Sequence, residues 1–219
     1  MDQTRQKQIA KEAAKILLDT KSVLFNAAEP FTYTSGKQGP VYTDCRRLIA
    51  FTEERETLMG FAVEMLSETI DMENLDYIAG GETAGIPYAA FIAQLMHKPM
   101  LYVRKKPKGF GRMAQIEGHM PEGGCNVILI EDLQTDGGSK KTFIDALREA
   151  GGHVQHAFVL FHYGIFPASK KNMSDLGITL HALTTWWDVL EVAKEDNYFN
   201  EATLSSVESF LNAPEEWAA

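Results

Sequence analysis

Two acidic residues follow a run of apolar residues in the stretch VILIEDLQTDGGSKK, residues 127–141. The apolar run predicts a buried strand that would end at Glu131 and Asp132. The loop that follows, Thr135 to Ser139, offers two glycines, backbone N–H groups and a hydroxyl at the start of a predicted helix. Such N–H groups bind anions such as phosphate. Carboxylates repel an anion, so the ligand must offer each group a different partner.

A phosphorylated sugar satisfies both halves of this stretch. Its hydroxyls can donate hydrogen bonds to Glu131 and Asp132 while its phosphate accepts them from the loop amides. An acid pair also tolerates positive charge that develops on a sugar ring in a transition state. The loop lacks the GxxxxGK[ST] spacing of the Walker P-loop. The alternative is a purely structural acid pair that caps nearby amides at a strand end.

A second stretch, RKKPKGFGR from Arg104 to Arg112, has five basic residues among nine and no acidic residue. It directly follows a predicted strand and contains Gly109 and Gly111. These features favour a lid that carries positive charge over a polyanion. The alternative is a solvated basic loop without a ligand, which is the usual case for a run of charge.

A third stretch, GGETAG from Gly80 to Gly85, follows the strand predicted at Tyr77. Its glycines would let the backbone approach a ligand closely, although taken alone a tight strand-to-helix turn is the better interpretation. All three stretches follow predicted strands. Ligands of open parallel sheets bind beyond the carboxyl ends of the strands, so we expect the three stretches to meet there.

The chain alternates strands and helices from Tyr77 onward. A short strand is predicted at the start of YIAGGETAGIPYAAFIAQLMH, followed by a glycine-rich turn and a helix. Further strands are predicted in PMLYVR, CNVILIE, HVQHAFVLF and ITLHAL, with more helices among and after them. Continuous apolar strands that alternate with helices imply a parallel sheet covered on both faces. Thr52 and Ser139 are expected to cap helices, and Gly151 to end one. We expect a single α/β domain over residues 1–219, with about residues 1–50 as a small annex.

Composition narrows the class of protein. The 219 residues can bury a sizeable core, and the net charge of −9 argues against nucleic acid as the main partner. Cys45 and Cys125 form no disulfide pattern, and the six histidines show no metal-ligand spacing. The N-terminus lacks the apolar core of a signal peptide, and the longest apolar run is too short for a bilayer. We therefore expect a cytoplasmic protein without a membrane span.

The three stretches together resemble a known family. VILIEDLQTDGGSKK resembles the phosphoribosyl pyrophosphate signature of the type I phosphoribosyltransferases. PFTYTSGKQGPVYTDCRRL, IAGGETAGIPYAA and YVRKKPKGFGRMAQIEG are similar to segments of the orotate phosphoribosyltransferases. The resemblance runs in the same order from about Phe25 to Leu190.

The resemblance implies a type I phosphoribosyltransferase fold with a small N-terminal hood over the sheet. It implies transfer of the phosphoribosyl group of 5-phosphoribosyl 1-pyrophosphate to orotate, giving orotidine 5′-monophosphate and pyrophosphate in de novo pyrimidine (UMP) biosynthesis. Mg²⁺ would bind mainly through substrate oxygens, in line with its preference for phosphates and water. A homodimer is implied because the family's lid residues reach into the neighbouring subunit's site.

The resemblance also implies roles for individual residues. Lys105, Lys108 and Asp132 would act in catalysis. The residues that would bind substrate are Arg104, Lys105 and Lys108 at the pyrophosphate, Glu131 and Asp132 at the ribose, and the loop Leu133, Gln134, Thr135, Asp136, Gly137, Gly138 and Ser139 at the 5′-phosphate. Thr135 would also lie near orotate, and Gly80 to Gly85 would line the pyrophosphate side. Ser35, Gly36 and Lys37 would form a hood turn near orotate.

Several positions depart from the family pattern. Phe110 stands in place of a lid histidine and Thr34 in place of a hood lysine. In the loop, Asp136 stands in place of a small residue and Gln134 in place of an aliphatic residue or threonine. FHYGIFP offers only His162 and Tyr163 where many members have an arginine for orotate. Two alternatives therefore stay open. One is a regulator that binds phosphoribosyl pyrophosphate without catalysis, and the other is a transferase for another base.

Overall fold

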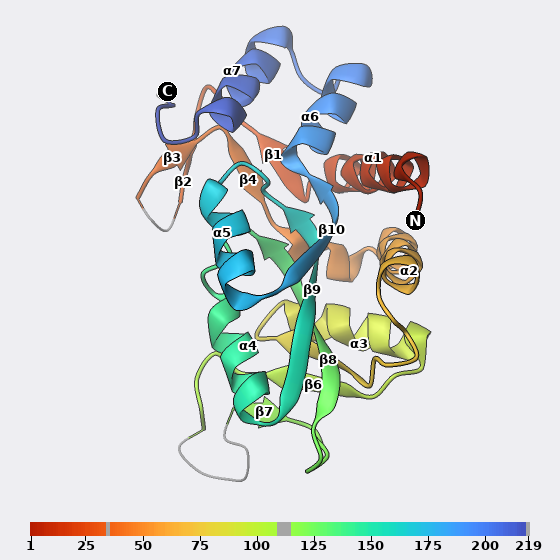
Figure 1. The fold of residues 1–219 in the computed structure, drawn as a ribbon. Helices are drawn as coiled ribbons and strands as arrows, with labels where there is room; N and C mark the ends of the chain where they lie inside the picture. The colour runs from red at the N-terminus through yellow and green to blue at the C-terminus, as the bar shows by residue number, and fades with distance from the viewer. Residues whose placement is uncertain (34–35, 109–114, 218–219) are drawn as a thin grey trace.

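The structure is a computed structural model that describes residues 1–33, 36–108 and 115–217. These residues form a central six-stranded sheet with strand order β10-β9-β8-β5-β6-β7 (Figure 1). The strands are β5 (Tyr77–Gly81), β6 (Met100–Val103), β7 (Ile116–Glu117), β8 (Cys125–Gln134), β9 (Gly152–His162) and β10 (Thr179–Thr185). Neighbouring strands pair in parallel except for β6 and β7. The predicted parallel sheet is thus confirmed, with one short antiparallel strand added at its edge.

Helices cover both faces of this sheet, as predicted (Figure 1). One face packs against α1 (Gln3–Asp19), α2 (Thr52–Thr69) and α3 (Gly85–Met96), and the other against α4 (Lys140–Glu149) and α5 (Pro167–Leu176). Strand β8 shows why both faces must be covered. Its Ile128 and Ile130 belong to the first core and its Val127 and Leu129 to the second, because successive side chains of a strand point to opposite faces.

Small elements gather at the end of the sheet where β8 and β9 finish (Figure 1). Strand β1 (Val23–Phe25) pairs with β4 (Val41–Thr43), and β2 (Phe31–Thr32) pairs with β3 (Gln38–Gly39). A 3₁₀ helix, η1 (Cys45–Ala50), leads from them into α2. The C-terminal helices α6 (Trp186–Glu195) and α7 (Glu201–Asn212) lie beside these strands. The ring of Phe25 in β1 lies 5.8 Å from that of Trp186 in α6, so both ends of the chain build this region.

Local helix signals were only partly right. Gly151, at φ 98°, follows the end of α4, as expected. Thr52 is already inside α2, since the N–H of Arg55 bonds to the carbonyl of Phe51, so the predicted Thr52 cap is wrong. Ser139 does precede α4, but its hydroxyl makes no capping bond to any described residue. Within the described ranges, no helix has both the length and the apolar character needed to cross a membrane.

Candidate active site

A cleft of about 360 Å³ opens at the carboxyl ends of β5 and β8. The three predicted stretches meet there, as the position of strand ends in a parallel sheet requires. Its lining from these stretches is Gly81, Glu82, Thr83, Ala84, Gly85, Lys105, Glu131, Asp132, Leu133 and Ser139. Thr43 and Arg46, from β4 and η1, complete it together with Phe143 of α4. Sequence reasoning gave no role to Thr43 or Arg46, although the basic pair Arg46–Arg47 beside Asp44 was a visible signal.

Glu131 is a buried, ion-paired carboxylate. Its Oε2 lies 2.5 Å from the Nζ of Lys140, and the Lys140 side chain is 1% exposed. The same ammonium lies 3.4 Å from the carbonyl oxygen of Leu133. One oxygen of Glu131 is therefore already occupied before any ligand arrives.

Asp132 is the more accessible acid of the pair. It is partly buried and lines the cleft. Burial raises the pKa of the Asp132 carboxyl above its ordinary value, and the negative charge of Glu131 raises it further. Hydrogen bonds from backbone N–H groups and the positive charge of Lys140 lower the same pKa. A ligand hydroxyl at this strand end would meet Asp132 more readily than Glu131.

The loop after β5 packs tightly against β8. A Cβ at Gly85 would come within 2.3 Å of the Ile130 carbonyl oxygen, and one at Gly80 within 2.8 Å of the Gly85 carbonyl oxygen. Only glycine permits these approaches. The peptide bond between Glu82 and Thr83 is cis. This tight turn also lines the cleft.

The predicted lid cations are divided between two places. Lys105 lines the cleft, and its backbone N–H donates to Glu82 Oε2 at 2.7 Å. Lys108 instead forms an ion pair with Glu117 of β7, and Arg104 Nη1 lies 3.7 Å from the same carboxylate oxygen. Arg104 and Lys108 thus lie along the sheet edge rather than in the cleft. Gly109, Phe110, Gly111 and Arg112 fall outside the described residues, as do Thr34 and Ser35 of the hood turn.

The loop after β8 folds back on itself. Gly137 has φ 80°, and the exposed Asp136 accepts a hydrogen bond from the Gly138 N–H at 3.0 Å. Neither neighbouring lysine is the partner of the exposed Asp136. Lys140 is buried on Glu131, and Lys141 pairs with Asp145. Asp136 instead binds its own loop, because an aspartate side chain readily accepts from an amide two residues on.

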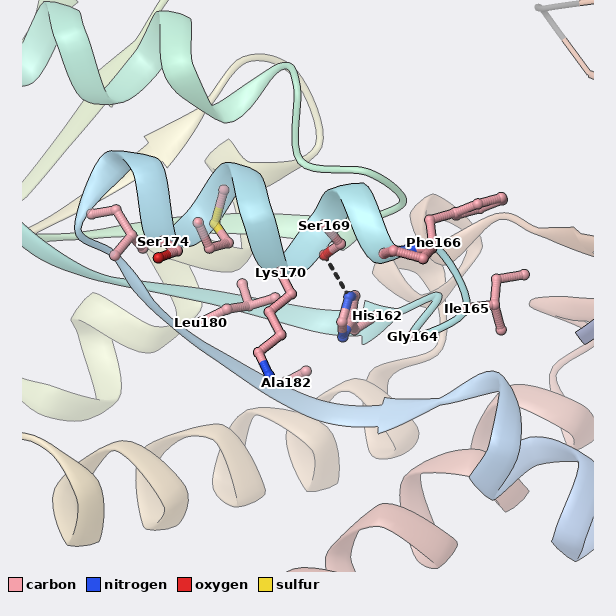
Figure 2. A pocket seen from close by; sticks show the side chains of 12 residues that line it. His162, Gly164, Ile165, Phe166, Ser169, Lys170, Ser174, Leu180 and Ala182 are labelled. Atoms are coloured by element: carbon pink, nitrogen blue, oxygen red, sulfur yellow. Dashed lines mark hydrogen bonds between the residues drawn. The ribbon is translucent and has the colours of Figure 1, made fainter. Parts of the chain in front are cut away.

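Side chains of α5 form hydrogen bonds with the end of β8 and with the loop that follows it. The buried Gln134 donates from Nε2 to the Ser169 hydroxyl at 2.7 Å, and His162 Nε2 lies 2.8 Å from the same hydroxyl (Figure 2). Asn172 donates to the Asp136 carbonyl at 2.8 Å. Burial lowers the pKa of His162, which favours the neutral ring. The Gln134 side chain therefore contacts α5 and does not line the cleft.

A larger cleft of about 660 Å³ lies between α5 and the edge strand β10 (Figure 2). It contains His162 and Ser169, and most of its other lining residues are apolar, including Phe166, Met173 and Leu180. None of the described residues predicted to bind substrate lines it. The chemistry-bearing residues thus point to the smaller cleft.

The chain is similar to known proteins in both sequence and fold. No family model matches the chain. The chain is 53% identical over 211 residues to an orotate phosphoribosyltransferase of Roseobacter denitrificans, covering 96% of this chain and 93% of that protein. It is 52% identical to one of Allorhizobium ampelinum, covering 96% and 91%. Its fold is similar to that of an orotate phosphoribosyltransferase crystal structure from Aeropyrum pernix, with a TM-score of 0.71, 28% identity, and coverage of 85% of this chain and 99% of that one.

Proposed function

The chain belongs to the orotate phosphoribosyltransferase family, and we propose that its strand-end cleft is where that reaction takes place. The phosphoribosyl group of 5-phosphoribosyl 1-pyrophosphate passes to orotate and gives orotidine 5′-monophosphate and pyrophosphate, a step of de novo pyrimidine biosynthesis. A ring nitrogen of orotate forms the new bond to the anomeric carbon. The pyrophosphate oxygen leaves with the electron pair of the broken bond, and the ring nitrogen loses its proton to solvent. The observation that carries the proposal is the convergence of the acid pair, the glycine turn and Lys105 on one cleft.

The acid pair serves the ribose. Asp132 accepts hydrogen bonds from ribose hydroxyls, and the oxygen of Glu131 that Lys140 does not hold can accept another. Positive charge develops on the sugar ring as the bond to pyrophosphate breaks. Fixed negative charge beside the ring stabilises that state more than the ground state, which lowers the barrier.

The loop from Thr135 to Ser139 serves the 5′-phosphate. It precedes the N-terminus of α4, where backbone N–H groups and the helix dipole favour an anion. Thr135 faces orotate in this arrangement. The Gly138 N–H is held by Asp136, so the other amides of the loop carry the phosphate unless Asp136 rotates away.

The pyrophosphate lies between the loop after β5 and Lys105. Arg104 and Lys108 join it after leaving Glu117, and they do so across the interface of a homodimer. The oxygen-rich lining of the cleft fits a hard cation such as Mg²⁺. Substrate pyrophosphate and ribose oxygens would hold the ion, which would offset charge on the leaving group, and we assign no side chain to it.

The base lies under the hood, which we place in about residues 1–50, with Gly36 and Lys37 in the turn nearest to orotate. We propose that residues 1–219 act as one domain in the cytoplasm. The segment that follows β9 has no arginine to offer orotate, and Tyr163 is buried against Trp186. We propose that Arg46, which lines the cleft, takes the place of that arginine.

A turnover assay tests the proposal. The purified protein is incubated with Mg²⁺, 5-phosphoribosyl 1-pyrophosphate and, separately, orotate, uracil, adenine or hypoxanthine. We expect orotidine 5′-monophosphate and pyrophosphate in equal amounts with orotate only. Product with a different base would contradict the choice of substrate. Binding of the sugar pyrophosphate without product from any base would favour the regulator.

A further inference from the structure

Lys140 is a buried cation that contacts no ligand in the proposed function. It is the first residue of α4, and its side chain is 1% exposed. A positive charge in the first turn of a helix opposes the helix dipole. Burial of an ammonium group is costly as well. Both the position and the burial of this ammonium group are unfavourable, so a specific anionic partner must compensate for them.

That partner is Glu131. The ammonium lies 2.5 Å from Glu131 Oε2, and Glu131 itself is 8% exposed. The Leu133 carbonyl oxygen, at 3.4 Å, is a weaker second acceptor. The contact holds the carboxylate of Glu131 at the end of β8 and joins it to the start of α4. The acid pair at the end of β8 and the start of α4 are thereby held together, and with them the phosphate loop that connects β8 to α4.

The pairing also changes the charge that a ligand meets. Two carboxylates and one ammonium leave one net negative charge at the strand end instead of two. The substrate is a polyanion and must place its ribose at this point. A second uncompensated carboxylate would repel its phosphates, whereas one free carboxylate suffices for the ribose hydroxyls.

The positive charge of Lys140 also favours the ionised form of Asp132. Burial and the charge of Glu131 raise the pKa of Asp132, and the charge of Lys140 lowers it. Removing Lys140 alone would therefore favour protonation of Asp132. Removing Glu131 alone would favour its ionised form.

We propose that Lys140 is a positioning residue that fixes and neutralises Glu131, so that Asp132 presents the free carboxylate to the ribose. The proposal rests on the proposed function of the cleft. It assigns the two acids different tasks, with Glu131 as the brace and Asp132 as the ligand-facing group.

The test compares Lys140→Met, Glu131→Gln and the double variant with the wild type. Lys141→Met is the matched control, because Lys141 is the next residue of the same helix, is exposed and pairs with Asp145. The kcat and KM for 5-phosphoribosyl 1-pyrophosphate are measured with orotate and saturating Mg²⁺ across pH. Circular dichroism and thermal unfolding record whether each variant is folded.

We expect Lys140→Met to raise KM by about tenfold and to move the acid limb of kcat/KM up by about one pH unit. Glu131→Gln should move the same limb down. The double variant should have a KM between those of Lys140→Met and the wild type, because it still lacks the Glu131 oxygen that can accept from the ribose. Its acid limb should lie near the wild-type position, since the net charge is restored. Lys141→Met should match the wild type.

Opposite shifts that cancel in the double variant would not arise from a merely structural role. Acid limbs that stay in place, or a double variant as impaired as Lys140→Met, would overturn the proposal. If Lys140→Met does not fold, the downward shift in Glu131→Gln and its reversal in the double variant decide the question. A wild type without turnover on orotate would contradict the proposed function instead.

Discussion

The Asp136 carboxylate orders its own loop but would oppose the binding of a phosphate there. Its carboxylate accepts from the Gly138 N–H at 3.0 Å and so orders the loop that would hold the 5′-phosphate. The same charge opposes that phosphate. At about 7 Å and an effective dielectric of about 20, the repulsion is about 2 kcal/mol before salt screening. The side chain is exposed, and water and salt screen such a charge strongly.

Asp136→Asn separates the charge from the hydrogen bond, because the amide oxygen can still accept from Gly138. We expect the Kd for 5-phosphoribosyl 1-pyrophosphate to fall by less than about threefold, since screening removes most of the repulsion. Isothermal titration calorimetry at low and high salt measures this. A tenfold gain that shrinks as salt rises would show that the carboxylate faces the phosphate.

At the scale of elements, Glu117 in β7 holds the segment that leaves β6. It pairs with Lys108 and lies 3.7 Å from Arg104, two cations proposed to meet pyrophosphate. The carboxylate and the ligand thus compete for the same groups. The short edge strand β7 is therefore important because it positions the Glu117 carboxylate beside these two cations.

Glu117→Gln removes the competing charge. We expect pyrophosphate to bind about threefold more tightly, measured by calorimetry at low salt, with a smaller gain at high salt. Glu73→Gln, an exposed acid between α2 and β5, is the control and should bind as the wild type does. Unchanged binding in Glu117→Gln would mean that the ion pairs have no influence on the ligand.

Strand β10 at the opposite edge depends on histidines that must stay neutral. His156 Nδ1 of β9 lies 3.1 Å from His181 Nε2 of β10, and His181 Nδ1 faces the Thr69 hydroxyl of α2 at 3.4 Å. Burial lowers the pKa of both rings, to about 4 for His181. Two protonated rings could not share this hydrogen bond, so acid should loosen the edge of the sheet.

The pH dependence follows from the sign of these shifts. A base with a lowered folded-state pKa stabilises the fold above its unfolded pKa of about 6.5 and loses that contribution as pH falls. We expect Tm to drop between pH 6.5 and 4, and to drop less steeply in His181→Gln. Differential scanning calorimetry in buffers of equal ionic strength measures both slopes. Equal slopes in the two proteins would show that His181 does not titrate on unfolding in this range.

At the scale of the whole molecule, the sequence predicted those features whose residues lie close together along the chain. The acid pair, its loop and the glycine turn each lie within a few residues and follow a predicted strand, so their meeting at one edge followed from the parallel sheet. Lys140 was missed because a lysine in a first helical turn usually points to water, and only the packing of α4 on β8 buries it. Thr43 and Arg46 were missed because the small N-terminal strands reach the cleft only in three dimensions.

The position of Lys108 bears on how two chains would form a complete site. Lys108 does not line the cleft of its own chain, yet the proposed function gives it a contact with pyrophosphate. The proposed contribution across a homodimer interface would resolve the difference. Lys108→Ala should then lower kcat by about two orders of magnitude, as loss of an electrostatic contact to a leaving group does. Asp132→Asn should impair the ribose site of its own subunit to a similar degree.

Mixing the two variants distinguishes contribution within one chain from contribution across the interface. A hybrid dimer has one doubly impaired site and one site that combines an intact Asp132 with an intact Lys108 from its partner. Half of the dimers are hybrids after random exchange at equal concentrations, so about a quarter of wild-type activity should return. Native mass spectrometry of subunits of different mass confirms the exchange. A fully exchanged mixture no more active than the separate variants would place Lys108 in the site of its own chain, because only a shared site is repaired by mixing.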